Sequence, residues 1–241
     1  MRAYVDALLS VLLAPECAAC ARPLSRPTDG PVCGGCWNSI PPLPPPLCDV
    51  CGDPLPAWRL AATTAAECAR CRRLPRHVAR ARAIGAYEGA LRSIVHALKY
   101  GGRRSLAKPL GRLMRERGRD VLDGADIAVP VPLHPSRRRE RGFNQADDLA
   151  RYLGLPVAGA LCRIRATAAQ ADLPAARRHG NVRDAFGLRY RAGSLAGTRV
   201  VLVDDVSTTG ATLDACARVL KAGGVREVRA LTAARVVTAR R

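Results

Sequence analysis

Eight of the ten cysteines in this 241-residue chain fall into C-x-x-C pairs near its N-terminus. The pairs are Cys17/Cys20, Cys33/Cys36, Cys48/Cys51 and Cys68/Cys71. Two cysteines separated by two residues can present both sulfurs to one tetrahedral ion, and two such pairs complete a four-thiolate zinc site. Because no cysteine of the segment falls outside the pattern, the sequence predicts two structural zinc ions. A full thiolate shell leaves no open position for catalysis at zinc.

The cysteine segment also repeats itself, which bears on how the pairs combine. Residues 17–24 and 48–55 both read C-x-x-C-x-x-P-L, and each copy is followed by one further pair. A repeat implies two equivalent units, so we expect one site from the first two pairs and a second from the last two. The alternative is a cross-braced arrangement, in which the first pair combines with the third and the second pair with the fourth. Each unit has too few apolar residues for its own core, so zinc must stabilise it, by about 10–16 kcal/mol per site.

The charge of the chain is strongly positive and unevenly distributed. There are 39 Lys and Arg against 20 Asp and Glu. Residues 1–76 carry 8 basic and 6 acidic groups, and residues 77–241 carry the other 31 and 14. This imbalance favours a polyanionic partner for the second part, namely nucleic acid, a phosphorylated substrate or an anionic membrane. A solvated basic surface without a specific partner is the alternative.

The N-terminal residues 3–14 are apolar, but Asp6 interrupts them and no small-residue cleavage site follows. Four leucines, Leu8, Leu9, Leu12 and Leu13, share one face of a short helix. We expect this face to pack against the rest of the chain, with contact to a membrane surface as the alternative. The chain has no apolar run long enough for a transmembrane helix. A cytoplasmic location is expected, which argues against structural disulfides.

Residues 77–241 alternate between helical and strand patterns, whereas residues 1–76 hold the ribbon segment, so we expect two domains. The predicted helices lie within 85–102, 105–117, 144–153 and 211–222. The predicted strands cover 126–132, 157–164, 198–203 and 225–232. Alternation of this kind implies an α/β fold with a mainly parallel sheet and helices on both faces.

Residues 200–212, VVLVDDVSTTGAT, form the most informative segment of the second part. A buried strand ends at Asp204 and Asp205, at the sheet edge where open α/β folds bind ligands. Adjacent carboxylates can accept hydrogen bonds from two neighbouring sugar hydroxyls. A short loop then opens a helix, whose backbone N–H groups and dipole favour a phosphate. The loop residues are Val206, Ser207, Thr208, Thr209, Gly210, Ala211 and Thr212. Together these features predict a ribose 5-phosphate site.

This segment resembles the signature of type I phosphoribosyltransferases, which bind phosphoribosyl pyrophosphate (PRPP) together with Mg²⁺. The resemblance implies that Asp204 and Asp205 hold the ribose hydroxyls and that residues 206–212 hold the 5′-phosphate. Thr208 stands where purine-salvage relatives carry an aspartate that contacts the base. The sequence therefore identifies no acceptor substrate and does not establish turnover.

Residues 130–145, PVPLHPSRRRERGFNQ, and 98–102, LKYGG, combine with the double ribbon to resemble the ComF family of bacterial competence and DNA-uptake proteins. By that resemblance, the loop 132–144 takes the pyrophosphate position and residues 165–185 form a flexible hood. The implied pyrophosphate and hood residues are His134, Arg137, Arg138, Arg139, Arg141, Asn144, Gln145, Gln170 and Arg177. A solvated charge run is the alternative for the four arginines.

The resemblance implies a PRPP-binding protein that acts in uptake or processing of single-stranded DNA, near DNA-uptake proteins at the inner membrane face. One alternative is a phosphoribosyltransferase of nucleotide metabolism that uses its zinc ribbons as a scaffold. Another is a nucleic-acid-binding or partner-binding protein without catalysis, in which the PRPP site is regulatory.

Overall fold

The computed structural model describes residues 1–56, 66–74, 76–165, 184–189 and 195–237. Its main sheet has four parallel strands in the order β1-β6-β5-β2. These strands are β1 (Arg80–Ala83), β2 (Ile127–Pro130), β5 (Arg199–Ser207) and β6 (Glu227–Arg235). All four carboxyl ends therefore lie at one edge of the sheet.

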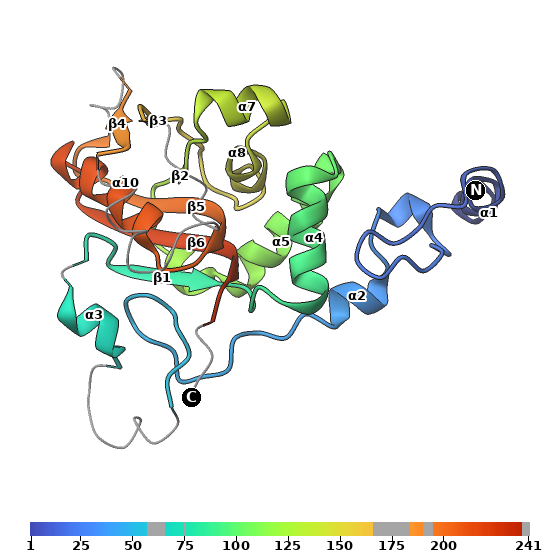
Figure 1. Ribbon diagram of the computed structural model, residues 1–241, viewed down its shortest axis with the longest axis horizontal. Coiled ribbons are helices and arrows are strands. Elements are labelled where there is room, and N and C mark those ends of the chain that lie inside the picture. The colour runs from blue at the N-terminus through green and yellow to red at the C-terminus, as the bar shows by residue number, and fades with distance from the viewer. Residues whose placement is uncertain (57–65, 75, 166–183, 190–194, 238–241) are drawn as a thin grey trace.

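Helices cover both faces of this sheet, as predicted (Figure 1). On β5, Val201 and Val203 belong to the buried cluster of one face, whereas Val200 and Leu202 belong to that of the other. The alternation follows from the two-residue period of a strand. One face packs on α4 (Gly89–Tyr100), α5 (Ala107–Arg117) and α8 (Gln145–Ala150), and the other packs on α10 (Ala211–Ala222).

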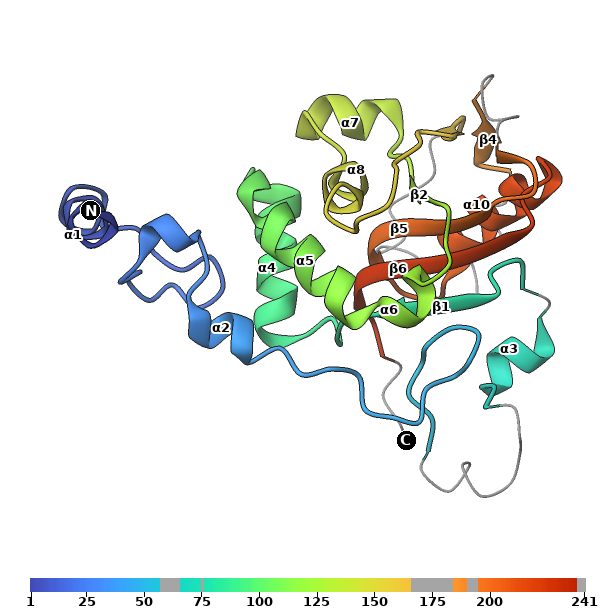
Figure 2. The same ribbon diagram turned by 180° about the vertical axis from the view of Figure 1, so that it is seen from behind.

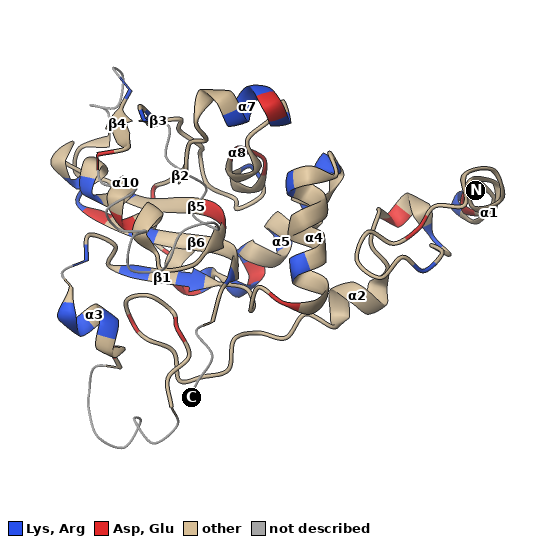
Figure 3. Ribbon diagram, viewed as in Figure 1, with Lys and Arg blue, Asp and Glu red and all other residues tan. Residues whose placement is uncertain are grey.

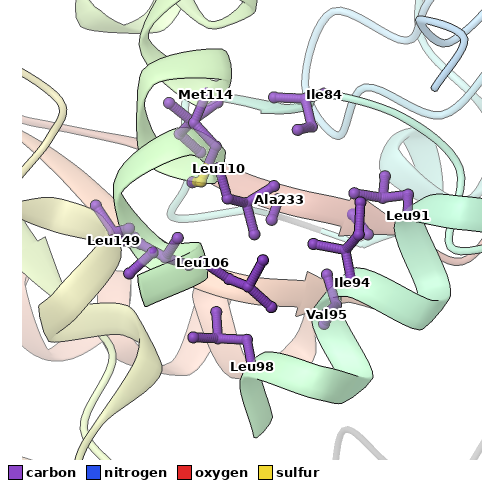
Figure 4. Close-up of a cluster of buried hydrophobic side chains, with 14 of the residues drawn as sticks. Ile84, Leu91, Ile94, Val95, Leu98, Leu106, Leu110, Met114, Leu149 and Ala233 are labelled. Atoms are coloured by element: carbon purple, nitrogen blue, oxygen red, sulfur yellow. The ribbon is translucent and has the colours of Figure 1, made fainter. Parts of the chain in front are cut away.

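The core between α4, α5 and the sheet is built from one apolar side of each helix. Figure 4 shows Leu91, Ile94, Val95 and Leu98 of α4 pointing toward Leu110 and Met114 of α5. These side chains recur at helical spacing, so that each helix buries one continuous apolar stripe. Burial of this stripe fixes where the last turn of α4 lies relative to β5.

In its described residues, the cysteine-rich segment contains two short helices, α2 (Gly34–Asn38) and α3 (Ala69–Arg73), with a 3₁₀ turn at Pro27–Asp29. Further helical elements described in the second part are α6 (Arg119–Leu122), α7 (Pro135–Arg141) and a 3₁₀ turn at Arg104–Leu106. Figure 2 shows the chain between α2 and α3 passing beside β1.

The strand predicted over 157–164 is shorter than expected and lies outside the main parallel sheet. Only β3 (Leu161–Arg163) is a strand, and it pairs antiparallel with β4 (Phe186–Leu188) in a separate two-stranded sheet. The chain touches the main sheet where the N–H of Ala158 donates to the Ala128 carbonyl, and it then turns away from β2. The helix predicted over 144–153 is also shorter, since α8 ends at Ala150.

The prediction that the N-terminal leucines pack against the rest of the chain is wrong. Leu8, Leu12 and Leu13 of α1 (Arg2–Leu13) are 59–70% exposed. The buried residue of this helix is Asp6, whose carboxylate accepts hydrogen bonds from the N–H and hydroxyl of Thr28. A polar contact rather than an apolar face therefore anchors α1, at the end of the molecule remote from the sheet (Figure 1). In the part of the chain that the structure describes, no helix has the length and apolar character needed to span a membrane.

Candidate functional site

The eight clustered cysteines form two tetrads. Within each tetrad all four sulfur atoms lie within 4.8 Å of one another. The Sγ–Sγ distances are 3.8 Å for Cys17–Cys36, 3.9 Å for Cys20–Cys33 and 3.7 Å for Cys51–Cys68. A zinc ion with Zn–S bonds of about 2.3 Å fits such a tetrahedron. The tetrads combine the first pair with the second and the third with the fourth, so the sequential arrangement is confirmed.

The two ribbons also share their backbone geometry, as the repeat predicted. The N–H of Cys17 donates to the Arg22 carbonyl at 2.8 Å, and that of Cys48 donates to the Asp53 carbonyl at the same distance. The fifth position of each turn, Ala21 or Gly52, is left-handed. In both ribbons a short helix begins at the second cysteine pair. The N–H of Cys33 donates to the Cys17 sulfur, and the N–H of Cys68 donates to the Cys48 sulfur. Such donors stabilise thiolates, which are the form that binds metal.

The acidic pair lies at the carboxyl end of β5, inside the strand and not after it (Figure 3). The strand runs four residues beyond the predicted end because residues 204, 206 and 207 pair with β6. The Asp205 carboxylate lies 2.8 Å from the Lys99 ammonium at the end of α4. Its backbone N–H donates to the Asp204 carboxylate at 2.8 Å. The two acids are thus held in fixed, different environments.

Asp204 has an unusual electrostatic environment. Burial, followed by the neighbouring negative charge of Asp205, raises the pKa of the Asp204 carboxyl to about 7. Lys99 opposes this shift, and the charge of Asp205 in turn raises the pKa of the Lys99 ammonium. A carboxyl with such a pKa is poised to gain or lose a proton near neutral pH, which is typical of functional sites.

The loop after the acids leads directly into α10. Gly210 adopts a left-handed backbone with φ of 78°, and no atom would meet a Cβ placed on it within 4 Å. The hydroxyl of Thr209 accepts a hydrogen bond from the N–H of Ala211 and so caps the helix start. The first N–H groups of any helix lack intrahelical acceptors. This geometry can cradle an anion in front of α10.

A basic hollow of about 610 Å³ lies beside the carboxyl end of β2. Arg138 and Arg139 of α7 line it from one side, and Arg163 and Arg189 line it from the other. Arg163 and Asp204 are close enough for their charges to influence each other. Two of the four predicted arginines, Arg138 and Arg139, therefore line the same hollow as Arg163, whose charge acts on Asp204.

Several other predicted site residues have internal partners. His134 caps α7 by accepting from the Ser136 N–H, and the Asn144 side chain caps α8 and donates to the Val131 carbonyl. Arg141 donates to Gln145 and stacks over the Tyr100 ring. Arg137 is half-buried on α7. Gln170, Arg177 and residues 166–183 of the expected hood lie outside the described residues.

Two features of the site were missed by the sequence analysis. The first is α7 itself, because the loop predicted over 132–144 contains a helix from Pro135 to Arg141. Proline at the first helical position and Gly142 just past the end were available signals. The second is the role of Lys99, which enters the sequence analysis only as a member of the LKYGG segment. No local pattern reveals its contact with Asp205, because α4 and β5 meet only through tertiary packing.

Comparison with protein families divides the chain between two models. Residues 8–72 match the double zinc ribbon domain, and residues 139–240 match the phosphoribosyl transferase domain. The fold class, a parallel sheet with helices and an N-terminal double zinc ribbon, is confirmed by these matches and by the topology.

Comparison with curated proteins finds relatives over most of the chain. Competence protein F of Haemophilus influenzae is 31% identical over 88% of this chain and 93% of that protein. The DNA utilization protein YhgH of Salmonella typhimurium is 34% identical over the same shares. Competence protein ComFC of Streptococcus pneumoniae is 26% identical over 64% of this chain and 67% of that protein.

Proposed function

This chain belongs to the ComF family, with competence protein F and YhgH, and from that premise we propose that it binds Mg²⁺–PRPP and acts on single-stranded DNA during uptake or processing. One observation carries the PRPP proposal. The paired carboxylates of Asp204 and Asp205 end a parallel strand and are followed at once by the anion-cradling loop before α10. The acidic pair suits the ribose hydroxyls and the loop suits the 5′-phosphate, and only a few residues of chain separate the two.

Each part of the ligand has a proposed partner. Asp204 and Asp205 accept hydrogen bonds from the ribose hydroxyls, and the N–H groups of residues 208–212 bind the 5′-phosphate. The arginines of the basic hollow, Arg138 and Arg139, face the pyrophosphate. Carboxylate oxygens are ligands that Mg²⁺ accepts, and Asp204, whose charge interacts with that of Arg163 in this hollow, offers one. The ion would neutralise charge on the pyrophosphate.

If the protein is catalytic, the reaction is displacement at the anomeric carbon of ribose. The bond from that carbon to the pyrophosphate oxygen breaks while a nucleophile bonds to the carbon, and the electron pair leaves with pyrophosphate. Arginine side chains stabilise the charge that develops on the departing group. Lys99 holds the Asp205 carboxylate through the 2.8 Å ion pair and orients it toward the sugar.

The DNA part of the proposal rests on charge and on the family. Residues 77–241 carry an excess of 17 positive charges, 31 basic against 14 acidic. A polyanion would be attracted to such a surface in a salt-dependent way. The proposed location is cytoplasmic, next to DNA-uptake proteins at the membrane.

Calorimetric titration of the zinc-loaded protein with Mg²⁺–PRPP tests the first part. We expect binding by the wild type and a loss of at least about tenfold in the double variant Asp204→Asn/Asp205→Asn, which loses charged hydrogen bonds to the sugar. Absence of PRPP binding in the wild type would refute the proposal. The titration repeated with single-stranded oligonucleotide at two salt concentrations tests the second part. PRPP binding without any affinity for DNA would favour a role in nucleotide metabolism.

A further inference from the structure

The second zinc ribbon is joined to the edge of the main sheet. The N–H of Ala81 on β1 donates to the Val50 carbonyl at 2.7 Å, so the ribbon turn is hydrogen-bonded to the edge strand. Arg82 donates to the Asp49 carbonyl at 3.2 Å. A Cβ at Gly52 would lie only 2.5 Å from the Ala81 carbonyl oxygen, which shows how closely the two backbones approach. This ribbon is therefore fixed relative to β1 and its neighbour β6.

A buried arginine links this ribbon to the phosphate loop. Arg235 ends β6, pairs in register with Ser207, and has a side chain only 3% exposed. Its Nε donates to the Asp53 carboxylate at 2.9 Å. Asp53 follows Cys51 by two residues, in the turn that presents the third cysteine pair. The zinc ribbon therefore orients one edge of the Arg235 guanidinium.

One terminal nitrogen of this guanidinium, Nη2, has no hydrogen-bond partner among the described residues. Among the described residues, Arg235 Nη2, Ser207 Oγ and two nitrogens of Arg76, Nε and Nη2, are all buried without one. All three residues line a single small hollow, together with Thr209 and Gly210 of the phosphate loop. Buried donors without acceptors are unfavourable, and native proteins contain few of them.

The contents of this hollow can be argued from its chemistry and its size. Its volume is about 20 Å³, which is enough for about one water-sized atom. Two arginines and a hydroxyl contribute donors, and an arginine fork suits a phosphoryl oxygen. Two acceptors on its lining already have donors: the Asp214 carboxylate accepts from the His77 backbone N–H at 2.7 Å, and the Cys51 sulfur accepts from Arg70 Nη2 at 3.7 Å. An anionic oxygen satisfies these donors better than water, which would bring its own hydrogens.

We propose that this hollow seats one oxygen of a phosphoryl group held at the start of α10, with Arg235 as a phosphate-binding residue that the second zinc ribbon positions. The proposal rests on the proposed function only in taking the 5′-phosphate of PRPP as the natural source of that group. Free phosphate offers the same chemistry. The zinc ribbon would then be part of the binding site as well as a structural element.

The test uses the full zinc-loaded chain and three ligands: inorganic phosphate, ribose 5-phosphate and Mg²⁺–PRPP. The variants are Arg235→Met, which removes the guanidinium, and Ser207→Ala, which removes only a hydroxyl without a partner. Arg199→Met is the control, because it also removes one arginine from the sheet, but at the start of β5 and away from the hollow. Zinc content and thermal unfolding establish that each variant is folded.

We expect Arg235→Met to lose at least about tenfold in affinity for inorganic phosphate and for ribose 5-phosphate, Ser207→Ala to lose less, and Arg199→Met to bind like the wild type. Equal affinities in Arg235→Met and Arg199→Met for every ligand that the wild type binds would overturn the proposal, and so would a wild type that binds none of the three. Loss of phosphate binding in Arg235→Met, in a protein that never binds PRPP, would support the hollow and refute the proposed function. Loss for ribose 5-phosphate and PRPP but not for inorganic phosphate would identify the sugar phosphate as the source.

Discussion

The ammonium of Lys99 lies 2.8 Å from the carboxylate of Asp205, with both side chains largely shielded from solvent. The contact joins the last turn of α4 to the carboxyl end of β5. A carboxylate can accept several hydrogen bonds, so a ribose hydroxyl can join this ion pair without displacing the lysine. We infer that Lys99 orients the acidic pair before any ligand arrives.

Replacement of Lys99 by methionine should destabilise the protein. The substitution keeps the length of the side chain but leaves Asp205 and Asp204 without their cation, and loss of one partner of a shielded ion pair costs about 2 kcal/mol or more. Urea unfolding at pH 8 measures the difference. Lys108→Met is the control, because Lys108 is exposed on α5. Equal unfolding free energies for the two variants would contradict this role of Lys99.

Asp204 should make the stability of the protein depend on pH. Its pKa is about 7 in the folded protein and about 3.9 in an unfolded chain. The folded state therefore holds the proton more tightly, and the stability contributed by the protonated form is lost as pH rises through 7. Relative to Asp204→Asn, whose side chain does not titrate, the wild type should lose on the order of 1–2 kcal/mol of stability between pH 6 and pH 8.5.

Urea unfolding across pH 6–8.5 checks this dependence, in a window where thiolate–zinc bonds persist. Asp123→Asn is the matched control, since it removes the same charge from an exposed turn. A wild type whose stability does not fall between pH 6 and pH 8.5, relative to Asp204→Asn, would show that the carboxyl of Asp204 titrates normally.

The two cysteine tetrads predict two zinc ions per chain. Cys48→Ser should retain one ion, because only the second tetrad loses a ligand. Cys162→Ser is the control and should retain both, since Cys162 lies on β3 away from the tetrads. Metal analysis after gel filtration gives the ratio. One ion per wild-type chain, or loss of both from Cys48→Ser, would refute independent sites.

Arg138 and Arg139 of the basic hollow should contribute to affinity for PRPP but not to affinity for ribose 5-phosphate. Arg138→Ala/Arg139→Ala should lower affinity for PRPP at least about tenfold, because charge-assisted bonds to the pyrophosphate are lost. Affinity for ribose 5-phosphate, which has no pyrophosphate, should change little. Calorimetry compares both ligands, with Arg112→Ala/Arg119→Ala as a control that removes two exposed arginines. An equal loss in both double variants would indicate a general charge effect and no specific site.

The zinc ribbons and the β5 segment could be predicted because their signals are local. Cysteine spacing places two sulfurs on one turn, and the repeat of C-x-x-C-x-x-P-L indicated which pairs combine. Four apolar residues followed by Asp204, Asp205 and a Thr/Gly loop likewise define a strand, its carboxyl end and a helix start. Neighbours in the chain decide each of these features.

Two predictions, the strand over 157–164 and the packing of the α1 leucines, were wrong because both depend on contacts with distant parts of the chain. An apolar pattern over 157–164 is compatible with any strand partner, and the structure pairs Leu161–Arg163 with β4. The leucines of α1 form an amphipathic face, but nothing in their spacing specifies a surface to receive it. Hydrophobic pattern predicts which face of an element is apolar and leaves its partner undetermined.

By itself, the sequence determined the two cysteine tetrads, the acidic pair, the Thr/Gly loop before α10 and the α/β class, since each follows from residue types at short, fixed spacing. Only the tertiary structure decided that Lys99 pairs with Asp205 and that Asp53 of the second ribbon holds Arg235 beside that loop. These contacts exist because parallel strands bring their carboxyl ends to one edge of the sheet. The end of α4 and the turn of the second ribbon that contains Asp53 meet the strands at that edge. Charged groups far apart in the chain then share a poorly solvated space, and their energies depend on each other.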